Sequence, residues 1–170
     1  MKLCFTGHRP QKLKGFQMSD NTEMLRELKK IIIDYIENKN VDTFISGMSL
    51  GIDIWSAFII LKLKETYPHI KLVCAIPCAN QYAVWKDEDS IEDWKDIVNR
   101  ADIVHYVSDE PFTQWCLHKR NEWMVDNADY VLAVWDGTKG GTANCIKYAK
   151  KKQSNILRLD PNTLELSQVV

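Results

Sequence analysis

The residues with the clearest chemistry form a glycine-rich stretch from Asp136 to Thr142, DGTKGGT, which follows an apolar run and precedes a basic helical pattern. The first amides of a helix have no partner within the helix and lie at the positive end of its dipole, so they bind phosphate or carboxylate groups. Gly137, Gly140 and Gly141 allow positive φ angles and let a ligand approach without meeting a Cβ. The stretch predicts an anion site, although a tight turn that uses glycine only for its geometry has the same pattern.

Two basic side chains, His8 and Arg9, lie between Gly7 and Pro10 at the end of the first apolar run. Pro10 biases Arg9 toward extended backbone and prevents direct entry into a helix, so these residues form a loop. Arg9 suits bidentate pairing with a phosphate, and His8 suits a hydrogen bond to a phosphate, a ribose hydroxyl or a base. The alternative is that both are solvated loop residues.

Three further positions have a structural and a functional interpretation. Asp53 is the last residue of SGMSLGID and falls in the first turn of a helix that Ser49 is placed to cap, where the dipole favours any carboxylate. Its functional role is an acceptor for ribose hydroxyls. Trp85 either stacks on a base or packs over the edge of the sheet. Arg120 and Asn121 point about 100° apart on a helix and cannot both be buried against one surface, so one is expected at the site, with an ordinary surface arginine as the alternative.

Catalysis has less support than binding. The sequence contains no G-x-S-x-G, no H-E-x-x-H, no Walker lysine and no G-x-G-x-x-G after the first apolar run. The five cysteines lie mostly in apolar runs, which suits reduced thiols, and no set of ligands at zinc-like spacing accompanies them. We therefore expect no metal, no cofactor and no disulfide.

Length and charge limit the partners. A chain of 170 residues suits one domain, residues 1–170. The 22 Lys and Arg residues against 23 Asp and Glu residues give a net charge of -1, which makes nucleic acid an unlikely main partner. The N-terminal apolar run is too short for a signal peptide and no run of 18 apolar residues occurs, so a cytoplasmic protein without membrane contact is expected.

Strands and helices alternate along the chain. Strand-type runs cover residues 2–6, 43–46, 71–76, 102–107, 130–135 and 155–160, and helical patterns cover about 21–38, 49–66, 90–100, 113–127 and from 142 onward. Asp20 with Glu23, and Ser90 with Asp93, predict helix caps, while residues 161–170 predict nothing. Continuously apolar strands in this order indicate an α/β fold, a Rossmann-like, doubly wound and mostly parallel sheet of about six strands with helices on both faces.

Three of the glycine-bearing loops follow strands of this sheet. Right-handed crossovers place the carboxyl ends of parallel strands along one edge, and ligands bind there where the strand order reverses. The loops GHRP, SGMSLGID and WDGTKGGT are therefore expected at one crevice. Unrelated turns of an α/β domain remain the alternative.

The chain resembles the YpsA-type branch of the SLOG superfamily in five motifs in the same order. They are FTGHRP, SGMSLGID, the spacing P-x3-Q-x3-W of Pro77, Gln81 and Trp85, KRNEWMVDNAD and WDGTKGGT. The superfamily is Rossmann-like and includes LOG phosphoribohydrolases, the DNA-processing protein DprA and sensor domains for nucleotide-derived signals. The resemblance implies a nucleotide-like ligand, and relatives commonly pair as homodimers. The expected ligand-binding residues are Gly7, His8, Arg9, Ser46, Gly47, Gly51, Asp53, Gln81, Trp85, Arg120, Asn121, Asp136, Gly137, Gly140, Gly141 and Thr142.

One position departs from the enzymatic branch. The signature P-G-G-x-G-T-x-x-E of LOG enzymes supplies a glutamate for N-glycosidic cleavage, and the matching position here is Cys145. A cysteine cannot replace a carboxylate in that role at neutral pH. The sequence thus favours a sensor or sequestering module for an ADP-ribose-like or other signal nucleotide. A nucleotide hydrolase that uses Asp53 or Asp136, and a protein-interaction module without ligand, remain alternatives.

Overall fold

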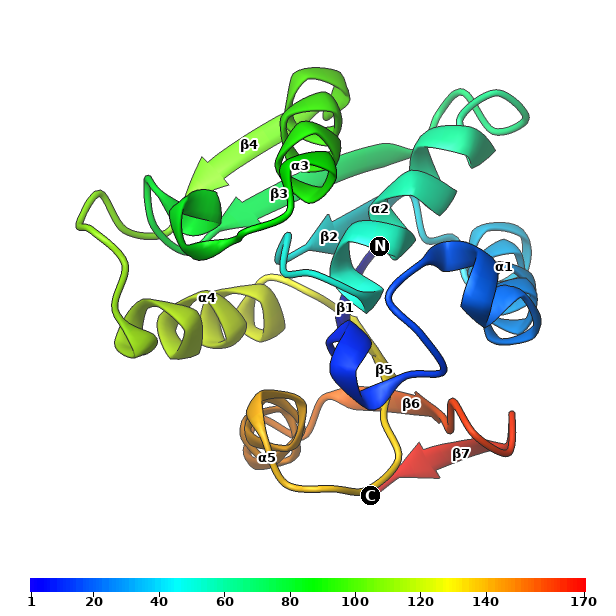
Figure 1. Ribbon diagram of the computed structural model, residues 1–170. Coiled ribbons are helices and arrows are strands. Elements are labelled where there is room, and N and C mark those ends of the chain that lie inside the picture. The colour runs from blue at the N-terminus through cyan, green and yellow to red at the C-terminus, as the bar shows by residue number, and fades with distance from the viewer.

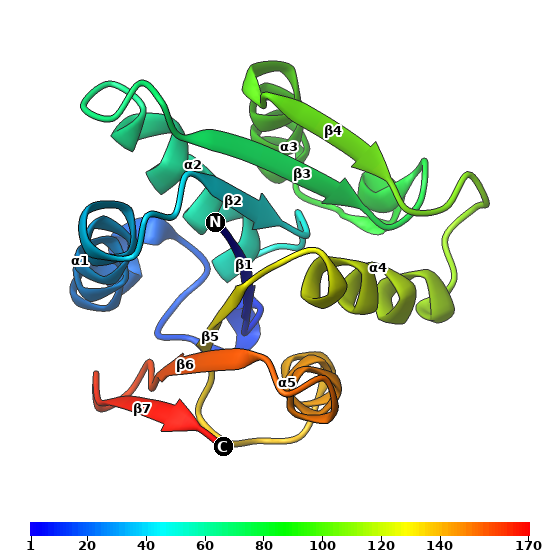
Figure 2. The same ribbon diagram turned by 180° about the vertical axis from the view of Figure 1, so that it is seen from behind.

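The computed structural model describes residues 1–170 as a seven-stranded sheet with helices on both faces (Figures 1 and 2). The strands lie in the order β4-β3-β2-β1-β5-β6-β7, and all neighbours are parallel except β6 and β7. Their bounds are β1 Lys2–Gly7, β2 Thr43–Ser46, β3 Lys71–Ile76, β4 Ile103–Tyr106, β5 Tyr130–Val134, β6 Asn155–Leu159 and β7 Leu166–Val169. The predicted Rossmann-like, mostly parallel sheet is confirmed, with β7 as a strand that the sequence did not predict.

Five α-helices connect the strands: α1 Thr22–Asn38, α2 Ile52–Leu63, α3 Glu88–Arg100, α4 Gln114–Asp126 and α5 Gly141–Lys151. Three short 3-10 turns, η1 Pro10–Lys12, η2 Met18–Asn21 and η3 Gln81–Val84, lie in the loops after β1 and β3. One apolar core joins α1, α2 and α3 to one face of the sheet, and a smaller core joins α4 and α5 to the other face. Burial of alternate strand residues on opposite faces explains why the strands read as continuously apolar.

Three predicted helix caps were wrong. Asp20 accepts the Gln17 amide at 3.1 Å within η2, so it belongs to a turn that precedes α1. Ser49 does not cap α2, which begins after Gly51. The helix α3 begins two residues earlier than predicted, because Asp87 and not Ser90 is its cap and accepts the Asp89 amide at 3.3 Å. In each case another residue is the N-cap: Asn21 for α1, Gly51 for α2 and Asp87 for α3.

The strand order reverses between β1 and β5. The chain proceeds from β1 through β2 and β3 to β4 in one direction, whereas β5 lies on the other side of β1 and leads to β6. The loops after β1 and β5 therefore leave the carboxyl edge of the sheet side by side and toward opposite faces. This reversal is the point at which doubly wound folds bind ligands.

The loop after β1 packs tightly against the start of α2. A Cβ at Gly7 would lie 2.6 Å from Ile52 Cβ, and a Cβ at Gly51 would lie 2.6 Å from the His8 carbonyl oxygen. Gly51 also has a φ of 88°, which side chains rarely adopt. Both glycines are thus required by the close approach of α2 to β1.

We expect Gly51→Ala to lower the free energy of unfolding by about 1–3 kcal/mol, because the added Cβ combines a strained backbone with a contact on the His8 carbonyl. Urea unfolding followed by tryptophan fluorescence measures this change. Gly141→Ala is the matched control: its Cβ meets no atom within 4 Å, and its position is helical, so stability should be unchanged or slightly raised. Equal stability of Gly51→Ala and the wild type would contradict this account of the packing.

Candidate functional site

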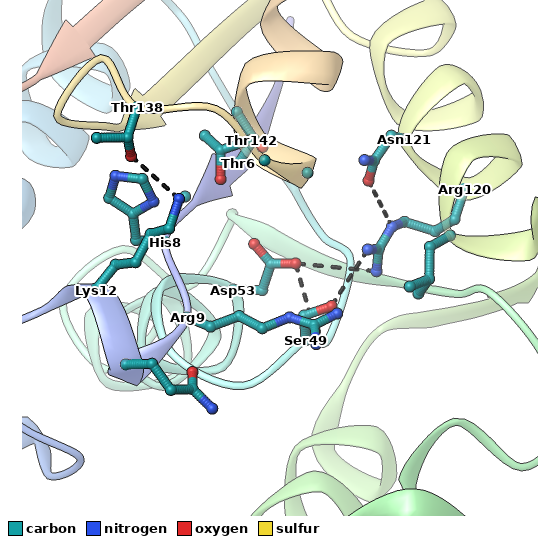
Figure 3. A pocket seen from close by; sticks show the side chains of 15 residues that line it. Thr6, His8, Arg9, Lys12, Ser49, Asp53, Arg120, Asn121, Thr138 and Thr142 are labelled. Carbon is teal, nitrogen blue, oxygen red and sulfur yellow. Dashed lines mark hydrogen bonds and ion pairs between the residues drawn. The ribbon is translucent and has the colours of Figure 1, made fainter. Parts of the chain in front are cut away.

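The loops after β1, β2 and β5 enclose a polar cavity of about 270 Å³ at the point of strand reversal (Figure 3). Its lining includes only one hydrophobic side chain, Leu117 of α4. The predicted site residues that line it are Gly7, His8, Arg9, Asp53, Arg120, Asn121, Gly140, Gly141 and Thr142. The sequence thus located three loops and one helix that do meet at one crevice.

The start of α5 forms one wall of this cavity. Gly140 precedes the helix with a φ of 149°, and the amides of Gly141, Thr142 and Ala143 donate no hydrogen bond to any protein group. A Cβ at Gly141 would meet nothing within 4 Å, so the space beside these amides is open. Neither a turn nor a close packing contact requires glycine at position 141, whereas an anion approaching the amides does benefit from it.

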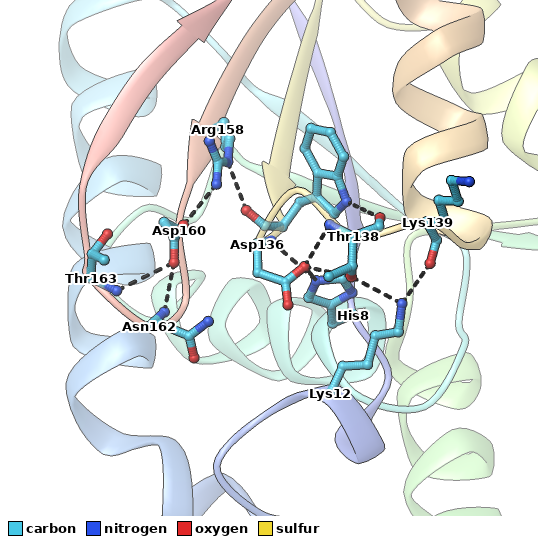
Figure 4. Close-up of polar contacts among 10 residues, drawn as sticks. His8, Lys12, Asp136, Thr138, Lys139, Arg158, Asp160, Asn162 and Thr163 are labelled. Atoms are coloured by element: carbon cyan, nitrogen blue, oxygen red, sulfur yellow. Dashed lines mark hydrogen bonds and ion pairs between the residues drawn. The ribbon is translucent and has the colours of Figure 1, made fainter.

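The glycine turn before α5 is held by side chains from three other segments (Figure 4). His8 Nε2 lies 2.7 Å from Asp136 Oδ1, which also accepts the Thr138 amide at 2.9 Å and the Thr138 hydroxyl at 2.6 Å. Lys12 Nζ donates to Thr138 Oγ1 at 3.1 Å and to the Lys139 carbonyl at 2.7 Å. On the opposite side, Arg158 Nε donates to the Trp135 carbonyl at 2.7 Å.

Asp136 and Gly137 therefore shape the turn and do not line the cavity. The pKa of Asp136 is held well below its usual range: burial raises it, but the hydroxyl and amide of Thr138 and the contact with His8 outweigh that effect. Gly137, with a φ of 95°, provides the bend of the turn. The sequence predicted both residues as ligand-binding, and their protein contacts give them a supporting position instead.

A buried arginine connects α4 to the loop before α2. Arg120 is 4% exposed and donates to the Gly47 carbonyl, to Ser49 Oγ at 3.2 Å and to Asn121 Oδ1 at 2.9 Å. Its Nη1 lies 3.9 Å from Asp53 Oδ2. The guanidinium is therefore fixed by the protein, and burial lowers the pKa of Arg120.

Arg120 and Asn121 are both among the expected ligand-binding residues and both line the cavity, although the helical angle between them favoured only one at the site. The two side chains meet because Arg120 Nε donates to the side-chain oxygen of Asn121, Oδ1, at 2.9 Å. Asn121 Nδ2 donates to no protein group, so it is available to a ligand.

Asp53 is a buried residue with one carboxylate oxygen that accepts no hydrogen bond from the protein. It is 5% exposed, and its Oδ2 accepts the Ser49 amide at 3.4 Å, while its Oδ1 has no hydrogen-bond partner. Burial raises the pKa of Asp53, and Arg120, the Ser49 amide and Arg9 partly offset this effect. An unpartnered oxygen on a buried carboxylate that lines the cavity is a ready acceptor for a ligand hydroxyl.

Arg9 is the cation that the protein leaves free. Its backbone is extended, as Pro10 predicts, with φ of -74° and ψ of 162°. The side chain is exposed, forms no ion pair or hydrogen bond with the protein, and lines the cavity. In Figure 3 it extends along the cavity toward Ser49 and Asp53. Arg9 therefore suits the phosphate contact that the sequence predicted.

The remaining predicted residues lie outside this cavity. Gly51, Gln81 and Trp85 line a second cavity of about 690 Å³ beside α2, and Ser46 and Gly47 are buried beneath the loop. The amide of Gln81 donates to the Gly47 carbonyl at 3.1 Å and accepts from Trp94 Nε1 at 2.9 Å, so its side chain is committed to the protein. Residues that the sequence did not predict complete the first cavity, namely Thr6, Gln11, Lys12, Ser49, Leu117 and Thr138.

The fold and this site define a Rossmann-like α/β protein with a polar crevice at the reversal of strand order. The profile of the YspA SLOG family (YpsA) matches residues 3–167. The chain therefore belongs to that family, as its motifs predicted. It is 35% identical over 145 residues to the SPbeta prophage-derived protein YoqJ of Bacillus subtilis (strain 168), covering 77% of this chain and 84% of YoqJ.

Two solved structures share the fold. DNA processing protein A from Helicobacter pylori, described for its single-stranded DNA binding mode, has 16% identity and a TM-score of 0.61, covering 97% of this chain and 67% of that one. DNA processing protein A from Streptococcus pneumoniae has 15% identity and a TM-score of 0.66, covering 96% and 52%. The expectation that nucleic acid is an unlikely partner has no support from these comparisons. None of the helices combines the length and apolar character needed to cross a membrane.

We expect Asp136→Asn to lower the free energy of unfolding at pH 7 by about 1–2 kcal/mol, because hydrogen bonds to a charged acceptor become neutral ones. The pKa of Asp136 is lower in the folded protein than in the unfolded chain, so its stabilisation is complete above the unfolded value and is lost as the pH falls through the folded one. Urea unfolding should thus show a difference between variant and wild type that narrows only below about pH 4. A difference that is constant down to pH 3 would contradict this role.

Proposed function

We propose that the protein binds a nucleotide or nucleotide-derived ligand and acts as a cytoplasmic sensor or sequestering module for it. The open space at Gly141, beside three unpaired amides of α5, is the observation that carries this proposal. It faces the same cavity as the free guanidinium of Arg9. Backbone amides at a helix start, a positive dipole end and an arginine are the combination that holds phosphate.

In this proposal the phosphate lies on the amides of Gly141 and Thr142, within reach of Arg9. The ribose lies beside Asp53, whose free oxygen accepts a hydroxyl, and beside the amide of Asn121. A cavity of 270 Å³ is somewhat smaller than the range of about 300–1,000 Å³ that is typical of ligand pockets. It suits a sugar and a phosphate, and the remainder of a nucleotide must extend beyond it.

Binding without cleavage is favoured by the residue at the catalytic position of related hydrolases. Cys145 is 1% exposed, and burial raises the pKa of its thiol to about 11. It therefore remains a neutral thiol at pH 7 and lies outside the cavity lining. The competing hydrolase function rests on Asp53, because a buried carboxyl group with a raised pKa is the kind of group that serves as a general acid.

Single-stranded DNA is a second candidate ligand, favoured by the fold shared with DNA processing protein A. A backbone phosphate offers the same chemistry to the amides of α5 as a nucleotide phosphate does. Competition between ADP-ribose and a short oligothymidylate for the protein separates the two candidate ligands. If DNA is the ligand, the oligothymidylate binds with a dissociation constant in the micromolar range or below, and its affinity falls steeply with added salt. A protein-interaction module would bind neither.

We expect Gly141→Ala to weaken binding of ADP-ribose or ADP at least tenfold, since the new methyl group occupies the space next to the amides while the fold is retained. Isothermal titration calorimetry measures the affinity, and urea unfolding verifies stability. Chromatography of the recovered ligand then distinguishes a sensor, which returns it intact, from a hydrolase. Affinity equal to that of the wild type would exclude the start of α5 from the site.

Arg9→Ala should weaken binding of the same phosphate ligands about tenfold or more, on the order of 1.5–3 kcal/mol for a hydrogen bond to a charged group. Stability should not change, because the Arg9 side chain has no protein partner. Arg26→Ala is the matched control, since Arg26 is also exposed and lies on α1, outside both cavities. Equal loss of affinity in the two variants would show a general effect of charge and remove Arg9 from the site.

A further inference from the structure

The second cavity adjoins the first. Both cavities are lined by Arg9, Gln11, Ser49 and Leu117, so they meet at these four residues, between the start of α5 and the start of α3. Its larger part, at about 690 Å³, lies within the size range of ligand pockets, whereas the smaller part lies just below it. A ligand whose phosphate occupies the first cavity therefore has room to place its other end in the second.

Aromatic and aliphatic side chains form one wall of the second cavity. Phe16 and Val84 are 68% and 60% exposed, which is unusual for large apolar side chains, and Trp85 and Phe112 lie partly exposed beside them. They line a cavity that adjoins the polar anion site. A flat aromatic ring suits these side chains best, because stacking and the removal of apolar surface from water both contribute favourably to the free energy of binding.

Another wall of the second cavity carries carboxylates from the first turns of α3. Asp87 is committed to the helix cap, because it accepts the Asp89 amide and the Ser90 hydroxyl. Asp89 and Asp93, four residues apart on one face of α3, line the cavity and have no hydrogen-bond or ion-pair partner. Lys86 is the cation on this wall, and it forms no ion pair with them. The helix dipole favours Asp89 in the first turn of α3, whereas Asp93 lies beyond that turn and repels Asp89 at this spacing, so the folding of α3 does not explain the pair.

The two cavities thus differ in the groups that they favour. The first offers unpaired amides and a free arginine to an anion, and the second offers an apolar wall and carboxylate acceptors to an aromatic ring with N–H donors. A purine with an exocyclic amino group meets both demands of the second cavity, because its faces are apolar and its edge donates hydrogen bonds. A second phosphate would meet three carboxylates there and is disfavoured.

We infer that the second cavity binds the amino-bearing purine base of the nucleotide, with Asp89 or Asp93 accepting its N–H donors and Trp85 and Phe16 covering its faces. This inference rests on the proposed function, since it extends the ligand whose phosphate lies at Gly141. It names the class of ligand as an adenine or guanine nucleotide, and it assigns to α3 the choice between bases.

Isothermal titration with ADP, GDP and IDP tests the inference, because hypoxanthine lacks the exocyclic amino group of both adenine and guanine. The wild type should bind the tighter of ADP and GDP at least tenfold more tightly than IDP. In the double variant Asp89→Asn, Asp93→Asn that preference should fall below about twofold. Glu92→Gln is the matched control: Glu92 is an exposed carboxylate on the same helix that does not line the cavity, so its loss should leave the preference unchanged.

Each other outcome is decisive. Equal affinity for all three nucleotides, still sensitive to Gly141→Ala, would overturn the reading of the base and leave the phosphate site intact. A preference that survives in the double variant would remove the α3 carboxylates from the site. Absence of binding to all three nucleotides would overturn this inference, whereas saturable binding of ribose 5-phosphate alone, sensitive to Gly141→Ala, would leave the proposed phosphate site standing without it.

Discussion

The contact between His8 and Asp136 joins the ends of the two central strands, and the geometry of the crevice depends on it. Because β1 and β5 are neighbours at the reversal of strand order, a side chain at the end of one can hold the loop of the other. Asp136 also accepts the Thr138 amide, so the glycine turn is held in place by the same side chain. Lys12 of η1 donates to the Thr138 hydroxyl and fixes the turn from a second side. The direction in which α5 begins is thereby fixed before any ligand arrives, and a preformed set of amides binds an anion without a cost of ordering.

The charged groups of the crevice divide into those that the protein uses and those that it leaves free. Arg120 donates hydrogen bonds to Gly47, Ser49 and Asn121 and lies near Asp53, so it fixes the loop before α2. Removing one member of a buried pair costs about 3–5 kcal/mol, because the other is left uncompensated. Arg9 forms no hydrogen bond or ion pair with the protein, and its charge is available to a ligand in the cavity that it lines. An arginine in a motif is therefore not by itself a ligand contact.

The sequence predicted the features that follow from periodicity and chain direction. Apolar runs and helical spacing predicted six of the seven strands and all five α-helices, and right-handed crossovers predicted that GHRP, SGMSLGID and WDGTKGGT would meet. It could not predict β7, because three of its four residues are exposed and leave no apolar pattern. The position of Gln81 was equally hidden, since its partners Gly47 and Trp94 are 34 and 13 residues away. Lys12, the last residue of the 3-10 turn that begins at Pro10, donates to Thr138 and Lys139, which are 126 and 127 residues away.

The central claim is that backbone amides at the start of α5 hold the anionic end of a nucleotide. An amide-resolved NMR titration of the uniformly ¹⁵N-labelled protein with ADP-ribose measures this directly. The account predicts that the largest saturable shifts occur at Gly141, Thr142 and Ala143, whose amides have no protein partner. Saturable binding that leaves these three resonances in place, while shifts concentrate elsewhere on the molecule, would contradict it.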